Sequence, residues 1–145
     1  MSIDPSLLEI HTHEGPGFRP LVNFGSWRVA VLNYIDHLEP QNLKDMQRHD
    51  ETDEVFVLLD GRCILFLGDG GETAGTLHAV DLVPRTLYNV KQGTWHTHTL
   101  SEDASVLVVE TRETTLENSP FCQLTSVQTA HLVAETRRLW EDPTA

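Results

Sequence analysis

The sequence predicts an all-β domain, a small antiparallel barrel or sandwich, followed by one C-terminal helix. Short runs rich in β-branched and aromatic residues follow one another between residues 27 and 111, with turn signals such as Asp60-Gly61 between them. After these runs, residues 127–140 show helical spacing behind the capping pair Thr125 and Gln128. Strands spaced in this way are typical of barrels and sandwiches, not of alternating strand–helix units.

Three segments are expected along the chain. Residues 1–20 carry three prolines and predict an irregular N-terminal arm. Residues 21–120 are expected to form the barrel, and residues 121–145 a helix packed on it. The polar stretch 36–45 reads as a connection. The predicted strands are Trp27–Tyr34, Glu54–Leu59, Arg62–Leu67, Thr76–Val83, Leu87–Val90, Trp95–Leu100 and Ser105–Thr111.

Length and charge limit the possible functions. The 145 residues fit one domain, and the formal net charge is −12. Such a charge repels phosphate backbones and anionic lipid surfaces, so neither nucleic acid nor membrane is an expected partner. No signal-peptide pattern and no apolar run of the length of a membrane helix, roughly 20 residues, is found in the sequence. We therefore expect a soluble cytoplasmic protein.

The first segment that carries chemistry is the polar stretch 47–54. Strand alternation would place Gln47, His49 and Glu51 on one face. The chain must then turn, so Glu54, which opens the next strand, is expected to look back toward His49. These side chains would meet inside a barrel.

The second such segment contains two histidines at alternate positions. His96 and His98 share a strand face, opposite Trp95. Imidazole nitrogen together with carboxylate oxygen is the ligand set of zinc, iron, manganese or nickel. The simpler interpretation of His49 and His96 is a hydrogen-bonded pair without metal.

The first segment resembles the first motif of the cupin superfamily, G(x)5HxH(x)3,4E(x)6G. His49 stands at the second histidine, Glu54 follows after four residues, and Gly61 after six more. Gln47 replaces the first histidine and Gln41 the leading glycine.

The second segment is similar to the second cupin motif, G(x)5PxG(x)2H(x)3N. Gly93 and His96 match it. Three motif positions, the glycine, the proline and the asparagine, are replaced by Arg85, Lys91 and Leu100.

The resemblance implies a cupin jelly-roll barrel with a divalent metal ion held by His49, Glu54 and His96, and with Gln47 in the first ligand place. A glutamine oxygen can ligate, with weaker binding expected than for histidine. Zinc, iron, manganese and nickel all fit. Cupins usually pair, so a homodimer is expected, with 21–22 and 27–32 as candidate contact segments.

Three functions follow from the resemblance. The first is a metal-assisted isomerase, lyase or dioxygenase acting on a small polar metabolite such as a sugar or a keto or hydroxy acid, with His98, Glu51 or Tyr88 moving protons. The second is a metal-free cupin resembling nucleotide-sugar ketoisomerases and epimerases. The third is a non-enzymatic protein that binds a small molecule.

Overall fold

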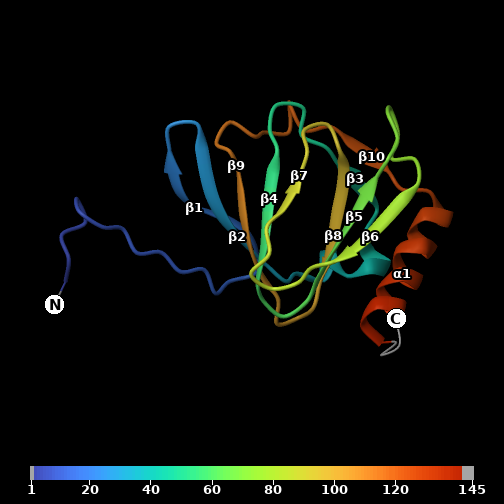
Figure 1. Cartoon of the computed structure of the whole chain (residues 1–145), viewed down its shortest axis with the longest axis horizontal. Helices are drawn as coiled ribbons and strands as arrows, with labels where there is room; N and C mark the ends of the chain where they lie inside the picture. The colour runs from blue at the N-terminus through green and yellow to red at the C-terminus, as the bar shows by residue number, and fades with distance from the viewer. Residues whose placement is uncertain (1, 142–145) are drawn as a thin grey trace.

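The computed structural model describes residues 2–141, which form two five-stranded antiparallel sheets packed face to face (Figure 1). The first sheet, in spatial order, contains β1 (Gly17–Phe24), β2 (Trp27–Asn33), β9 (Ser105–Thr111), β4 (Glu54–Asp60) and β7 (Tyr88–Val90). The second contains β10 (Phe121–Gln123), β3 (Asp45–Gln47), β8 (Trp95–Leu100), β5 (Cys63–Gly68) and β6 (Leu77–Asp81). The double-sheet architecture confirms the predicted all-β jelly roll.

The main core lies between the two sheets and follows from strand alternation. In β9 every second residue is buried, and Val106 and Val108 point inward. Phe56 and Leu58 do the same on the adjacent β4. The outward positions of both strands are more exposed. One buried and one more exposed face therefore arise from the period of two along each strand.

A second core lies on the outer face of the second sheet, under helix α1 (Ser126–Glu141). Leu132 of the helix packs there among apolar side chains that include Phe66 and Trp95. In Figure 1 the helix lies beside this sheet, at the end of the molecule far from β1. Because both faces of β5 are covered, nearly all of its residues are buried. This explains the continuous apolar run at 63–67.

The predicted capping pair is confirmed at the start of α1. The Thr125 N–H donates to Gln128 Oε1 at 2.9 Å, and the Gln128 N–H donates to Thr125 Oγ1 at 3.1 Å. Two backbone donors at the beginning of the helix are thereby satisfied. The connection expected at 36–45 contains two short 3₁₀ turns, Asp36–Leu38 and Pro40–Asn42.

The segment boundaries differ from those expected. Strand β1 begins at Gly17, so the arm is shorter than 1–20. Pro20 is tolerated because β1 is an edge strand and its register shifts between Pro20 and Val22. At the other end, residues 121–123 pair with β3, so the helix begins only at Ser126. Residues 142–145 of the expected helix lie outside the described residues.

The arm is fixed where it reaches the sheets and leads away from them before that point (Figure 1). Asn33 Nδ2 donates to the carbonyls of His13 and Gly15. Nearer the N-terminus the arm exposes several apolar side chains, Ile3, Leu7, Leu8 and Ile10. Homodimerisation stays a prediction. Among the described residues no helix has both the length and the apolarity to cross a membrane.

The Gly61 turn gives a stability test with a matched control. Gly61 and Gly25 both have positive φ, 68° and 53°. A Cβ on Gly61 would lie 2.6 Å from Ala104 Cα, whereas a Cβ on Gly25 meets nothing within 4 Å. We expect Gly25→Ala to cost about 1 kcal/mol of unfolding free energy from backbone strain alone.

Gly61→Ala should cost roughly 1–3 kcal/mol more than Gly25→Ala, because the clash with Ala104 adds to the strain. Urea unfolding of both variants measures this difference. Equal losses would show that the approach to Ala104 relaxes without cost.

Candidate metal centre

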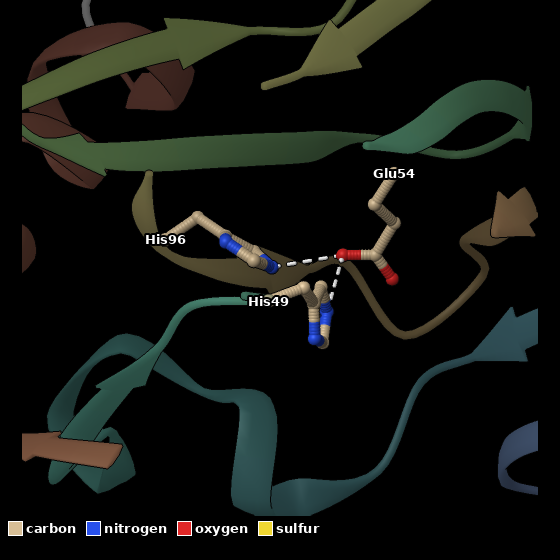
Figure 2. A group of neighbouring side chains, drawn as sticks. All are labelled: His49, Glu54 and His96. Carbon is tan, nitrogen blue, oxygen red and sulfur yellow. Dashed lines mark hydrogen bonds and ion pairs between the residues drawn. The ribbon is translucent and has the colours of Figure 1, made fainter. Parts of the chain in front are cut away.

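Two side chains from one short stretch of the chain, His49 and Glu54, meet the distant His96 between the two sheets (Figure 2). Glu54 opens β4 of the first sheet, His96 lies in β8 of the second, and His49 lies in the connection after β3. One ligand atom from each lies within 4.8 Å of the others, and all three residues are buried. The convergence predicted from the motif spacing is therefore present.

One carboxylate oxygen joins both imidazoles. Glu54 Oε2 lies 3.1 Å from His49 Nε2 and 2.8 Å from His96 Nε2. Figure 2 shows the carboxylate between the two rings, with both Nε2 atoms directed at it. The rings are tilted by 58° with their centroids 5.1 Å apart, so they converge on this oxygen and do not stack on each other.

The outer nitrogen of each ring is held by a neighbour. His96 Nδ1 donates to the Thr94 carbonyl at 2.9 Å, and a carbonyl can only accept. His49 Nδ1 lies 2.7 Å from Ser119 Oγ, whose own hydroxyl donates to Asn118 Oδ1. Both imidazoles are therefore assigned a proton on Nδ1, which leaves Nε2 as the inward atom.

This arrangement tests whether the residues fit a metal ion. With Nδ1 protonated, two Nε2 lone pairs and a carboxylate oxygen point at one place. They repel one another unless a cation lies among them, either protons on Nε2 or a metal ion. Two imidazoles and one carboxylate with fixed outer partners are a metal-binding donor set, so the residues fit a divalent ion.

The charges of the cluster follow from its contacts. Burial alone would raise the pKa of Glu54, but hydrogen bonds from His49 and His96 outweigh it and lower the pKa to about 2. Burial alone would lower the pKa of His96, but the bonded Glu54 carboxylate raises it. The carboxylate is thus ionised at neutral pH and favours a cation beside it.

The backbone holds the loop residue His49 in place. The Gly93 N–H donates to the His49 carbonyl at 2.8 Å, in a turn where Gly93 has a φ of 78°. A glycine is favoured at this φ, which accounts for its place in the motif. Gln47 pairs with His96 across β3 and β8, and its amide donates to the Ser119 carbonyl at 3.2 Å.

A cavity of about 360 Å³ opens beside the cluster. Its lining combines polar and apolar side chains: Phe18, Arg28, Leu32, Gln47, His49, Glu54, Phe56, His96, His98, Val108, Glu110, Thr114, Thr115, Leu116 and Ser119. A cavity of this size accommodates a small metabolite.

Comparison with known proteins gives matches at the level of structure alone. No family model matches the sequence, and no curated protein matches it. A Streptomyces protein, PAC13, with uridine superposes with a TM-score of 0.52 at 9% identity, over 82% of this chain and 88% of that one. Lactobacillus farciminis oxalate decarboxylase in its formate complex superposes with a TM-score of 0.51 at 15% identity. That match covers 75% of this chain and 32% of the decarboxylase.

A cupin-2 domain protein from Shewanella frigidimarina gives a TM-score of 0.49 at 18% identity, over 74% of this chain and 87% of that one. This chain thus spans about a third of the oxalate decarboxylase and most of the two smaller proteins. The chain has the cupin fold. Its small single-domain form agrees with the resemblance read from the two motifs.

His98 is the predicted proton carrier that lies on the cavity wall. Its Nδ1 is buried, with no hydrogen-bond partner among residues 2–141. Burial, together with the nearby His96, lowers the pKa of His98 to about 4 against the opposing charge of Glu54. The ring is therefore neutral at pH 7. Its proposed role in catalysis stays a prediction.

Two other predicted proton carriers lie outside the cavity lining. Glu51 is exposed, and its carboxylate accepts a hydrogen bond from Asn118 Nδ2 at 3.1 Å. The alternation that would have turned it inward ends with β3 at Gln47. The Tyr88 hydroxyl accepts from the Val83 N–H at 3.0 Å, and its ring packs against the main core. The structure thus corrects both placements.

The sequence interpretation missed a second carboxylate in the cavity, Glu110, which is 5% exposed. Its Oε1 accepts from Arg28 Nη2 at 2.6 Å and from Arg28 Nε at 3.0 Å, and its Oε2 lies 3.8 Å from His49 Nε2. Burial and the charge of Glu54 raise the pKa of Glu110, and Arg28 opposes this. The signal was available: Glu110 continues the inward alternation of Val106 and Val108.

Glu54 predicts an acid-stability signature. Its folded pKa of about 2 lies below the ordinary value of 4.5, so its stabilising contribution is complete above pH 4.5 and is lost as the pH falls toward 2. In metal-stripped protein, the slope of unfolding free energy against pH in this window should fall in Glu54→Gln by up to about 1.4 kcal/mol per pH unit.

Urea unfolding at a series of pH values from about 5 to 2 gives both slopes. If the native protein and Glu54→Gln share one slope, the carboxylate is not held ionised by the two histidines.

Proposed function

We propose that His49, Glu54 and His96 bind a divalent metal ion, and that the adjoining cavity binds a small polar metabolite. The observation that supports this most is the direction of the two histidines. Their Nδ1 atoms are occupied by Thr94 and Ser119, so their Nε2 atoms are left for a shared cation. Zinc, iron, manganese and nickel fit these donors, and the donors do not choose among them.

When bound, such an ion supplies Lewis-acid polarisation of a substrate oxygen, or redox chemistry if it is iron. The chain supplies the surroundings. Gln47 places an amide beside the cluster, and His98 offers a neutral imidazole on the cavity wall. Leu32, Phe56 and Val108 exclude water from one side. This set is compatible with isomerase, lyase or dioxygenase chemistry.

The fold does not choose the substrate. The similar structures of PAC13 and oxalate decarboxylase carry uridine and formate, which share no chemistry beyond polarity. One fold hosts many functions because these reside in side chains grafted on it. The substrate class must therefore come from the cavity of this chain.

Metal-free chemistry is the second candidate, and one observation favours it. The Glu54 carboxylate already lies within hydrogen-bonding distance of both imidazoles. Protons on Nε2 can therefore take the place of a metal ion and hold the three groups together. A sugar or sugar nucleotide would then meet the neutral imidazole of His98 as the base. A protein that binds metal and a metabolite without turnover is the third candidate.

Elemental analysis tests the metal site. His96→Ala, purified without nickel resin, should lose the metal that native protein carries at one equivalent, because two of the three donors do not retain an ion as three do. His78→Ala is the matched control, since His78 is an exposed histidine paired with Asp69. Far-ultraviolet dichroism should be unchanged in both.

Full metal content in His96→Ala would remove His96 from the ligand set. Native protein without metal after incubation with zinc, iron, manganese and nickel would favour the metal-free candidate. Turnover of a panel of sugars and keto acids by metal-loaded protein then separates an enzyme from a binding protein.

Gln47→His tests the first ligand place. Gln47 lies beside His96 in the neighbouring strand and lines the cavity, so an imidazole there can add a fourth donor. We expect the affinity for zinc to rise at least ~10-fold, as an added nitrogen ligand would give. Competition with a chromophoric chelator measures the change. Unaltered affinity would place residue 47 outside the ligand sphere.

A further inference from the structure

A second polar group faces the cavity next to the metal centre. Arg28 and Glu110 stand directly opposite each other on β2 and β9. Both Nε and Nη2 of Arg28 donate to the same oxygen, Glu110 Oε1. The Arg28 side chain is 18% exposed and that of Glu110 is 3% exposed. An ion pair this deeply buried, on the wall of the cavity, is a built feature and not a solvated surface pair.

The Arg28 guanidinium is held in one orientation and still has N–H donors that no protein group accepts from among the described residues. Its central carbon lies 5.5 Å from the centre of the Phe18 ring, which packs against the guanidinium. Glu110 occupies the Nε edge. Arg28 makes no further hydrogen bond to a residue between 2 and 141, so the Nη1 group and one Nη2 hydrogen are free for a ligand. Such a planar fork matches a carboxylate in shape.

The charges around the cavity favour a ligand that carries a single negative charge. Glu54, Glu110 and Arg28, with a divalent ion on the histidines, leave one net positive charge in a largely buried space. A monocarboxylate would neutralise it. A neutral sugar would leave it uncompensated, and a phosphate dianion would reverse it with only one arginine to receive it.

We propose that Arg28, positioned by Glu110 and Phe18, binds the carboxylate of a small organic acid whose remainder lies toward the metal centre. The acid is small because the cavity measures about 360 Å³. Glu110 is a positioning residue: it holds the Nε edge and so turns the opposite edge to the ligand. The assignment rests on the proposed function and narrows its substrate class to carboxylic acids.

Two pairs of probes isolate the charge of the ligand: glycolate with glycolamide, and propionate with propionamide. Within each pair, the only difference is that the charged carboxylate of the acid is replaced by a neutral carboxamide. Calorimetric titration of metal-loaded protein should show tighter binding of both acids, at least ~10-fold over their amides, as a charge-assisted bidentate pair gives.

The variant is the double exchange Arg28→Gln with Glu110→Gln. Removing Arg28 alone would leave Glu110 buried and unpaired, whereas the double change keeps a neutral amide pair. We expect the acid-over-amide preference to fall at least ~10-fold, with metal affinity measured separately and close to native. Arg62→Gln with Asp81→Asn is the matched control, because that pair also carries a ring, Trp140, against the guanidinium and lies outside the cavity lining.

The outcomes separate this assignment from the metal site. Native protein that binds neither acid better than its amide, or a double variant that keeps the native preference, overturns the role of Arg28. Absence of metal overturns the proposed function instead. The same titrations of metal-free protein then still measure whether the preference depends on Arg28.

Discussion

The Glu54 carboxylate is the interaction on which the site depends, because it is a buried charge that connects the two sheets. Removing a carboxylate from water costs several kcal/mol unless cations or donors replace the lost hydration. His49 and His96 provide that replacement, and they are held ready by Thr94 and Ser119. A buried acid with two imidazoles and their fixed outer partners is a costly arrangement for packing alone, and it is the donor set that a metal ion uses.

Strand β8 connects this chemistry to the rest of the fold. Its residues alternate between two environments: Trp95 enters the core under α1, while His96 and His98 face the cavity. The helix therefore stabilises the strand from the side opposite to the histidines. The loop residue His49 is fixed by two contacts, the Gly93 N–H to its carbonyl and Ser119 Oγ to its ring. Rigid strands and a tied loop together preorganise the three donors.

Two neighbouring polar groups of opposite character line the cavity. The histidine–glutamate cluster directs lone pairs at one place, as a cation site needs, whereas Arg28 offers N–H donors, as an anion site needs. Apolar side chains such as Leu32 and Val108 lie in the same wall and reduce the water that would screen both charges. The ligand proposed for this cavity carries a carboxylate for Arg28 and an oxygen for the metal ion.

The sequence by itself determined the features that depend on neighbouring residues: the strands, the faces of the strands and the start of the helix. Alternation predicted the strands and the face shared by His96 and His98, and the Thr125–Gln128 spacing predicted the helix start. The resemblance to the two cupin motifs implied the set His49, Glu54 and His96. Glu51 was misplaced because its face depended on how far β3 extends, and hydrogen bonding to β8 and β10 sets that limit. The pairing of Arg28 with Glu110 joins residues 82 positions apart. Only the register between β2 and β9 places them opposite each other, and that register is a property of the assembled sheet.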